Sequence, residues 1–350
     1  MSLNVGVVGA SGYAGGELVR LLSTHPKVSI SMVTSRRNAG KPVSNEIPIL
    51  KGRLNIKFEE PDPPKIIEKC DFVFMATPHA VSMELTPQIL EVGIKVVDLS
   101  GDFRLKNPEI FKRYYGVDHK APDLLDEAVY GLPEINREKI KNARLVACPG
   151  CFATPSIIAL FPLVKEKLIR EHVFIDAKTG SSGAGRTPSP ADHHPERTNM
   201  VRPYSPGEHR HVPEIEQALA PHGKVKVTFV PHAVDMVRGI LSTIYSITME
   251  NVDEQSVWKA FRSCYSGERF IRFIHWKSGG LYRFPNPKIT LGTNYCDLGF
   301  KLLKDQKTLI IFSSIDNLIK GAAGQAIQNM NIMLGYEEDA GLDFPGIYPV

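Results

Sequence analysis

The chain has 350 residues, enough for about two domains with well-filled cores, and its apolar and charged content is that of an ordinary globular protein. A net charge of +4, without any block of lysine and arginine residues, argues against a nucleic-acid-binding protein. No apolar run approaches the roughly 20 residues that span a membrane, and five cysteines in so long a chain indicate a reducing, cytoplasmic setting.

The first third of the chain alternates short apolar runs with segments of helical periodicity. We expect strands at residues 4–8, 28–34, 72–76 and 95–98, with helices between them. Because the first strand begins almost at Met1, the sequence leaves no room for a signal peptide. Alternating strands and helices predict an open, mostly parallel sheet of the α/β class.

A glycine-rich turn follows the first expected strand and precedes a helix, with the spacing G-x-x-G-x-x-G from Gly9 to Gly15. Glycines at such a turn let backbone N–H groups approach a pyrophosphate at the helix N-terminus, so we expect a dinucleotide there. A tight turn that binds nothing is the alternative. The residues assigned to the cofactor in this turn are Gly9, Ser11, Gly12, Tyr13 and Ala14.

The end of the second expected strand indicates which dinucleotide is bound. NAD enzymes place an acid there for the ribose hydroxyls, whereas NADP enzymes need cations and hydroxyl donors. The strand ends in Ser35, Arg36 and Arg37, without an acid. The sequence therefore favours NADP(H), and a solvated basic turn is the alternative.

A polar turn, residues 100–104, follows the strand at residues 95–98. Ligands of α/β sheets bind at the carboxyl ends of strands. Arg104 is therefore a candidate to bind a substrate carboxylate or phosphate through its forked guanidinium.

A cysteine turn lies between a buried strand, residues 145–147, and a helix that starts near Thr154. A thiol at a helix N-terminus feels the positive end of the helix dipole, which favours the thiolate. Cys151 is therefore a candidate nucleophile, the alternative being a buried, inert cysteine. A thiolate beside a nicotinamide indicates one class of reaction, in which an acyl group forms a thioester and hydride transfer gives an aldehyde.

After Cys151 the regular alternation of strands and helices is no longer seen in the sequence. Strand-like segments at residues 173–178, 225–231, 240–247, 270–276 and 309–313 have few helices between them, which predicts a second domain with a largely antiparallel sheet. A polar stretch at residues 180–213 is long enough to be functional. Its segment Gly180–Arg186 is a candidate nest of backbone N–H donors around an anion. Residues 316–334 are expected to form a helix rich in small residues.

Two histidines near the end of this stretch are candidates for acid–base catalysis. His209 and His211 are followed by Glu214, a carboxylate that can orient an imidazole. A metal site made from His193, His194, His209 and His211 is rejected, because no cysteine or carboxylate ligand has matching spacing.

Six motifs in order carry a resemblance to a known family: Gly9-Ala10-Ser11-Gly12-Tyr13, Asp102-Phe103-Arg104-Leu105, Pro149-Gly150-Cys151-Phe152, Ser182-Gly183-Ala184-Gly185, His209-Arg210-His211-Val212-Pro213-Glu214-Ile215 and Asn317-Leu318-Ile319-Lys320-Gly321-Ala322-Ala323-Gly324-Gln325. The chain resembles the N-acetyl-γ-glutamyl-phosphate reductase family from end to end. The resemblance implies a Rossmann-type NADP-binding domain over residues 1–150, completed by a C-terminal helix within residues 316–350. It also implies an α+β catalytic and dimerisation domain over residues 151–315, and a homodimer or homotetramer.

The resemblance also assigns roles to residues. It makes Cys151 the nucleophile and one of His209 and His211 the acid–base group, with His211 favoured because Glu214 lies close behind it. It also puts Asn317 near the cofactor. Beside these implied roles, we expect Ser182 and Gly183 at the cofactor, and Arg104 and Ser181 at the anions of the substrate. Aspartate-semialdehyde dehydrogenase shares the expected fold and thiol chemistry but matches these motifs less well.

The chain departs from the family pattern at two places. Cys148 stands where the family often has Asn, and the resulting Cys-x-x-Cys leads to the hypothesis of an oxidative disulfide lock on Cys151. The segment at residues 192–200 resembles the branch of the family that acts on amino acids linked to a small acidic carrier protein, LysW. A basic, histidine-rich loop suits an acidic partner, which places His194 and Arg197 at the substrate, whereas a surface loop that binds nothing is the alternative.

These observations predict an enzyme that reduces an acyl phosphate with NADPH. The expected substrate is a LysW-linked α-aminoadipyl or γ-glutamyl phosphate of lysine or arginine biosynthesis, and the product is the semialdehyde. The same chemistry on the N-acetylated glutamyl phosphate is the first alternative. A non-catalytic NADP-binding redox sensor that uses Cys148 and Cys151 is the second.

Overall fold

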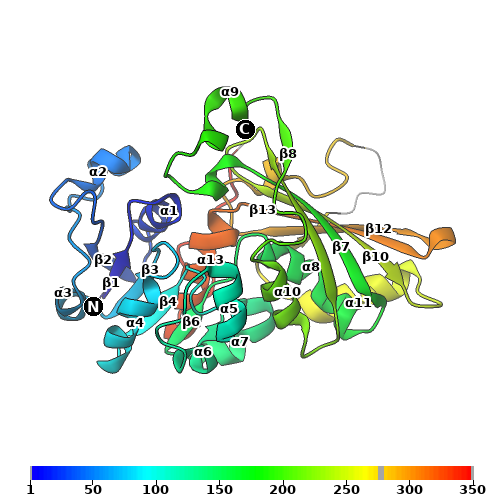
Figure 1. Cartoon of the computed structure of the whole chain (residues 1–350), viewed down its shortest axis with the longest axis horizontal. Helices are drawn as coiled ribbons and strands as arrows, with labels where there is room; N and C mark the ends of the chain where they lie inside the picture. The colour runs from blue at the N-terminus through cyan, green and yellow to red at the C-terminus, as the bar shows by residue number, and fades with distance from the viewer. Residues whose placement is uncertain (1, 275–279, 348–350) are drawn as a thin grey trace. The chain divides into compact units, whose positions relative to one another are not determined.

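The structure is a computed structural model that describes residues 2–274 and 280–347. Its contacts divide the chain into two compact units (Figure 1). Unit 1 comprises Met1–Pro149 and Ala322–Asp343, and unit 2 comprises Gly150–Gly321 and Phe344–Val350.

Unit 1 is built on a six-stranded sheet with the order β2-β1-β3-β4-β6-β5, in which every pair of neighbours is parallel. The strands are β1 (Leu3–Val8), β2 (Val28–Val33), β3 (Phe72–Met75), β4 (Lys95–Asp98), β5 (Val129–Tyr130) and β6 (Leu145–Ala147). The expectation of a parallel Rossmann-type sheet is therefore confirmed. The order reverses at β1, so the turn after β1 lies at the point where such sheets bind dinucleotides.

Helices lie against this sheet, as a βαβ chain requires. α4 packs on β4, and α3 packs on β1 and β2. The helices of unit 1 are α1 (Tyr13–Leu22), α2 (Val43–Glu46), α3 (Pro63–Lys69), α4 (Ser82–Glu91), α5 (Pro108–Tyr115), α6 (Leu124–Glu127), α7 (Pro133–Lys141) and α13 (Gly324–Leu334).

The C-terminal helix α13 belongs to unit 1, where it contacts α1, α7 and β4. Two of its buried amide groups bind the backbone there, because Gln325 Nε2 and Asn329 Nδ2 both donate to the carbonyl of Gly131, at 2.8 and 2.9 Å. The regular helix starts at Gly324 rather than at the expected Asp316. A π-helical turn, Ile319–Ala323, comes before it, because the Asp316 carboxylate and carbonyl accept the first N–H groups of that segment.

Unit 2 is built on a seven-stranded sheet with the order β11-β12-β13-β10-β7-β9-β8. Its strands are β7 (Ile169–Thr179), β8 (Val201–Pro203), β9 (Lys226–Val234), β10 (Ile240–Thr248), β11 (Ile271–Phe273), β12 (Cys296–Leu303) and β13 (Thr308–Ile315). Only the β7–β9 and β11–β12 pairs are parallel, which confirms the largely antiparallel sheet. The strand expected at residues 270–276 ends at Phe273, and residues 275 and 276 lie outside the described residues.

Helices cover one face of this second sheet (Figure 1). α8 (Ala153–Lys165) is buried at every position from Ala153 to Val164, and it packs on β7, β10 and β13. A helix that is apolar on all sides belongs in a core. α10 (Val212–Leu219) and α11 (Glu254–Tyr265) flank α8, whereas α9 (His194–Arg197) and α12 (Pro287–Thr290) are single turns.

The other face of the sheet carries apolar side chains that remain exposed. Phe174 on β7 is 47% exposed and pairs in register with Tyr245 on β10, which is 41% exposed. Ile247, two residues further along β10, is 42% exposed. Alternation of buried and exposed positions along β7 and β10 places these three side chains on one face.

Candidate active site

Cys151 lies in the turn directly before α8, and its side chain is half-buried. The turn is closed by Thr154, whose N–H donates to the carbonyl of Gly150 at 3.0 Å. The first N–H groups of α8 lack partners within the helix and carry the positive end of its dipole. The local fold therefore places the thiol where a negative charge on sulfur is stabilised.

His211 packs directly against the residue before Cys151. A Cβ atom built on Gly150 would lie 2.2 Å from His211 Nε2, which no side chain tolerates. His211 is buried and directly precedes α10. From the other side, the backbone of Gly321 approaches so closely that a Cβ atom there would lie 2.9 Å from Cys151 Cβ. Two glycines thus allow the close packing around the cysteine.

Glu214 is buried in the first turn of α10, and its Oε1 accepts the N–H of Gly150 at 2.6 Å. The sequence predicted that this carboxylate orients an imidazole. The contact seen here is with the backbone of the cysteine turn, so Glu214 anchors that turn. Its effect on His211 stays a prediction.

His209 is held among rings. Its centroid lies 4.6 Å from that of His211, 5.4 Å from Phe152 and 5.3 Å from Phe229. Burial, with a smaller contribution from the adjacent Arg210, lowers the pKa of His209 to about 4. Its Nδ1 accepts the backbone N–H of His211 at 3.2 Å, so the proton of the neutral ring is on Nε2. We call Gly150, Cys151, His209, His211 and Glu214 the Cys151 cluster.

The predicted pyrophosphate turn has the conformation that its glycines allow. Gly9 has a φ of +87°, and a Cβ atom on it would lie 2.5 Å from the carbonyl oxygen of Ala76. Gly12 is the N-cap of α1, so the exposed Tyr13 and the half-buried Ala14 begin the helix. The backbone N–H groups at this helix N-terminus suit a phosphate, so the turn fits a dinucleotide.

Ser11 connects this turn to the end of β2, because its Oγ lies 2.8 Å from Ser35 Oγ. Ser35 is buried, whereas the side chains of Arg36 and Arg37 are exposed. The end of β2 therefore carries the hydroxyl of Ser35, with that of Ser11 beside it, and two guanidinium groups. Such groups suit a 2′-phosphate better than a free ribose hydroxyl.

Arg104 is buried within unit 1 and bonded to the backbone there. Its Nε donates to the carbonyl of Cys148 at 2.7 Å, and one terminal nitrogen donates to the carbonyl of Leu99 at 2.8 Å. These bonds fix the turn after β4. Binding of a substrate anion by Arg104 stays a prediction.

The segment expected to form an anion nest uses its amides within unit 2. The N–H groups of Gly180, Ser181 and Ser182 donate to the carbonyls of Gly239, Met236 and Val237. The nest therefore does not form from these three amides. Asn317 joins the same segments, since its Nδ2 donates to Ser182 Oγ at 3.0 Å and its Oδ1 accepts the N–H of Gly239 at 2.7 Å. Gly183 follows Ser182 in a short 3₁₀ turn.

The segment at residues 192–200 is folded onto unit 2 through its backbone and its arginine. Arg197 donates to the carbonyl of Val234 at 3.1 Å, and Asp235 accepts the N–H of Asn199 at 2.7 Å. His194 begins α9 and is exposed. The loop therefore presents a histidine to solvent, while its arginine serves as an anchor.

Comparison with known proteins identifies the family. The model of the semialdehyde dehydrogenase NAD binding domain matches residues 4–143, and the model of the semialdehyde dehydrogenase dimerisation domain matches residues 151–317. The [LysW]-L-2-aminoadipate/[LysW]-L-glutamate phosphate reductase of Saccharolobus solfataricus is 49% identical over 350 residues, 99% of each chain. The N-acetyl-gamma-glutamyl-phosphate reductase of Methanopyrus kandleri is 47% identical over 347 residues, also 99% of each chain. This chain belongs to the N-acetyl-γ-glutamyl-phosphate reductase family.

The family confirms the sequence-based prediction of an oxidoreductase of the phosphorylating semialdehyde dehydrogenase type, with an NAD(P)-binding domain. Solved structures agree on the fold. The crystal structure of aspartate semialdehyde dehydrogenase II from Vibrio cholerae superposes with a TM-score of 0.73 at 16% identity, covering 96% of this chain and 99% of that one. The enzyme from Candida albicans gives 0.72 at 18% identity, covering 95% and 99%.

Sequence reasoning missed two features of the cluster in this reductase. It assigned no role to Tyr204, whose ring centroid lies 6.0 Å from that of His209. It also gave no reason for the glycine before Cys151, which the His211 ring requires. The one sequence signal for the contact between Tyr204 and His209 is that the two residues lie close together along one short loop.

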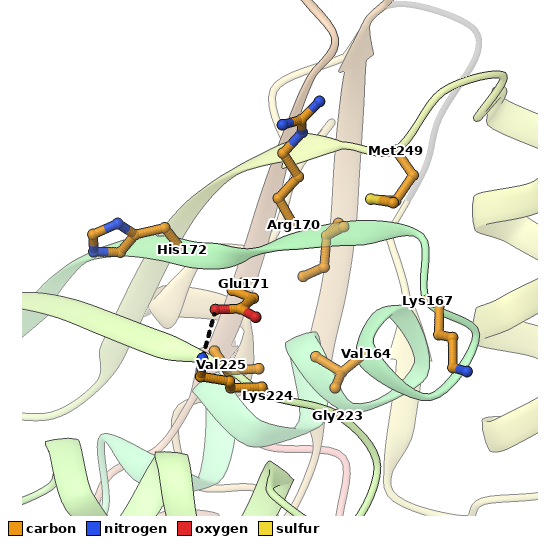
Figure 2. Close-up of a pocket in the computed structure, with 10 residues that line it drawn as sticks. Val164, Lys167, Arg170, Glu171, His172, Gly223, Lys224, Val225 and Met249 are labelled. Atoms are coloured by element: carbon orange, nitrogen blue, oxygen red, sulfur yellow. Dashed lines mark ion pairs between the residues drawn. The ribbon is translucent and has the colours of Figure 1, made fainter.

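A cavity elsewhere in unit 2 contains none of the predicted site residues (Figure 2). It is open, has a volume of about 710 Å³, and lies among the end of α8, the start of β7 and the segment before β9. Figure 2 shows Lys224 beside Glu171, an ion pair with a 3.3 Å N–O distance.

Among residues 2–274 and 280–347, no group of three or more His, Cys, Asp or Glu side chains is arranged to hold a metal ion. No helix there is long and apolar enough to cross a membrane.

Proposed function

We propose that this enzyme reduces a LysW-linked α-aminoadipyl or γ-glutamyl phosphate with NADPH, giving the semialdehyde for lysine or arginine biosynthesis. The observation that carries the proposal is the Cys151 cluster, in a chain that is 47–49% identical over its full length to reductases with [LysW]-linked substrates in their names. The N-acetylated glutamyl phosphate is a second candidate substrate, because relatives named for it are 47% identical.

Cys151 supplies the nucleophile in this proposal. Its sulfur attacks the carbonyl carbon of the acyl phosphate, phosphate leaves, and the acyl group is held as a thioester. When bound, NADPH supplies a hydride to that carbon. The resulting thiohemiacetal on Cys151 then collapses, so that the semialdehyde leaves and the sulfur is restored.

His211 moves the protons. Its ring packs against Gly150, next to Cys151, so it takes the thiol proton before the attack and returns a proton to the departing oxygen or sulfur. His209 is the weaker candidate for this role, because its pKa of about 4 makes it a weak acceptor for the thiol proton. Glu214 fixes the cysteine turn relative to α10 and so keeps the sulfur and the imidazole together.

Support for NADPH comes from unit 1. The turn with Gly9, Ser11, Gly12, Tyr13 and Ala14 would hold the pyrophosphate. Ser35, Arg36 and Arg37 would hold the 2′-phosphate, because the end of β2 offers hydroxyls and guanidinium groups and no acid. Ser182, Gly183 and Asn317 are also proposed to bind the cofactor.

Support for a carrier-linked substrate comes from the loop at residues 192–200. An acidic carrier protein would be attracted to exposed basic groups, and His193 and His194 are exposed in this loop, as is Arg210 further along the chain. Arg197, Arg104 and Ser181 would serve the anions of the substrate. Attraction of this kind is screened by salt, whereas a small acetylated substrate has less charge to screen.

The open face of the sheet in unit 2 supports self-association of the enzyme as a dimer or tetramer. Phe174, Tyr245 and Ile247 expose large apolar side chains on neighbouring strands, within the residues that match a dimerisation domain. Exposed apolar patches on one face of a sheet mark interaction surfaces. A second copy of this chain is the proposed occupant.

Two experiments test the function. Cys151→Ala is expected to lose reductase activity and retain NADPH binding, measured by calorimetry, and normal turnover by this variant would contradict the mechanism. Rates with the carrier-linked and N-acetylated acyl phosphates, compared at low and high salt, decide the substrate. Faster, salt-sensitive turnover of the carrier-linked form supports the proposal, and turnover of the acetylated form alone contradicts it.

A further inference from the structure

Tyr204 is fixed beside the strand that lies under the Cys151 cluster. It directly follows β8, and its N–H donates to the carbonyl of Pro231 on β9 at 3.0 Å. Gly207, three residues later, donates to the carbonyl of Phe229 on the same strand at 2.8 Å. The segment carrying Tyr204 therefore follows β9, and its half-buried ring is held in place by backbone bonds.

The tyrosine ring belongs to the group of aromatic residues around the cysteine turn. Its centroid lies 6.0 Å from that of His209, with the rings edge to face. His209 in turn lies 5.4 Å from Phe152, the residue after Cys151. One imidazole thus separates the Tyr204 ring from the residue next to the nucleophile.

The phenol also experiences the charge of the nucleophile. Burial raises the pKa of Tyr204, and the negative charge of Cys151 raises it further, against smaller opposing effects of Arg210 and Arg197. Tyr204 therefore keeps its O–H proton near neutral pH. It is a neutral hydrogen-bond donor near a site where the reaction creates negative charge.

We propose that Tyr204 is a further catalytic residue, whose O–H donates a hydrogen bond to the negative charge that forms at Cys151. The acceptor is first the thiolate and then the oxygen of the thiohemiacetal that grows from it. No proton is transferred and no bond breaks, so the phenol acts as a fixed dipole. This inference rests on the proposed function, because it requires Cys151 to be the nucleophile.

Tyr204→Phe tests the inference, since it removes only the hydroxyl and keeps the ring against His209. The first measurement is the pH dependence of Cys151 alkylation by iodoacetamide, which needs no substrate. The midpoint is expected to move to higher pH, with alkylation at pH 7 slowed by about threefold or more. The second measurement is turnover, where kcat is expected to fall by about 100-fold, the usual effect of losing one oxyanion donor.

Tyr282→Phe is the matched control, because Tyr282 is 40% exposed in the same unit and is expected to leave both measurements unchanged. Wild-type alkylation and wild-type kcat in Tyr204→Phe would overturn the inference, as would a change in KM alone. If Cys151→Ala is inactive while Tyr204→Phe behaves as wild type, only the inference fails. If Cys151→Ala turns over normally, the proposed function itself fails.

Discussion

Glu214 Oε1 accepts the N–H of Gly150 at 2.6 Å, which joins the start of α10 to the turn that carries Cys151. His211 directly precedes the same helix, and its ring fills the space that a side chain on Gly150 would need. The start of α10 therefore positions both the His211 imidazole and the cysteine turn. The proposed acid–base group and the proposed nucleophile are thus positioned by the same short segment.

Replacement of Glu214 is expected to loosen this arrangement. Glu214→Ala leaves the buried N–H of Gly150 without its acceptor, which costs about 1–3 kcal/mol in the free energy of unfolding. Glu214→Gln keeps an oxygen at the same place and is expected to retain most of the stability. Chemical denaturation and kcat measure the two variants. Equal losses in Gln and Ala would show that the charge, and not the hydrogen bond, is what matters.

An alanine at residue 150 is expected to push His211 away from the cysteine. The added Cβ would lie 2.2 Å from Nε2, and the ring cannot simply move aside, since it packs against Phe152 and His209. We expect Gly150→Ala to lower kcat by about 100-fold or more, comparable with loss of a general acid–base group.

A double-mutant cycle separates this effect from a general defect of the turn. If Gly150→Ala acts through the imidazole, it adds little to the loss already caused by His211→Ala. Fully additive losses in the double variant would instead mean that the turn itself, rather than the histidine, is damaged.

Local sequence patterns identify the residues of the candidate site but not all of the contacts between them. Cys151, His211 and Glu214 are recognisable because each occurs in a short motif with a plain chemical role. The bond from Glu214 to Gly150 is not, because it crosses 64 positions of sequence. Spacing alone placed the carboxylate beside the nearer histidine, which is a local inference about a contact that depends on tertiary packing.

The fold shows the same limit. The parallel sheet of unit 1 follows from alternating strands and helices, whereas β8, only three residues long, leaves no periodic signal. The glycine-rich segment that starts at Gly180 has the composition of an anion nest. Its first three N–H groups instead donate to carbonyls of residues 236–239, a long-range contact that the local sequence does not reveal. The expected helix at Asp316 begins late, because the side chain of that residue caps the turn before it.

Arg36 is expected to determine preference for NADPH over NADH. Arg36→Ala removes a charged partner of the 2′-phosphate, a contact of about 1.5–3 kcal/mol, so the KM for NADPH should rise by about 10- to 100-fold while that for NADH hardly changes. Arg53→Ala, at another exposed arginine of unit 1, is the control. Equal effects on both cofactors would mean that Arg36 does not contact the phosphate.

His209 makes the stability of unit 2 depend on pH in a definite direction. Its pKa is about 4 in the folded protein and 6.5 when exposed, so between these values the unfolded chain binds close to one more proton at this residue. Stability must therefore fall as pH drops from about 6.5 to 4, by up to about 1.4 kcal/mol per pH unit from this group. Burial lowers the pKa of His25 and His119 as well, so these two histidines give unit 1 a pH dependence in the same direction.

His209→Asn isolates the contribution of this residue. Asparagine can still accept the N–H of His211 through its side-chain oxygen, but it cannot be protonated. We expect the variant to lose less stability than wild type between pH 7 and pH 5, measured by denaturant midpoints at each pH. His25→Asn provides the comparison in unit 1. An unchanged pH dependence in His209→Asn would mean that His209 is protonated as readily in the folded protein as in the unfolded chain, and would make it again a candidate for the acid–base role assigned to His211.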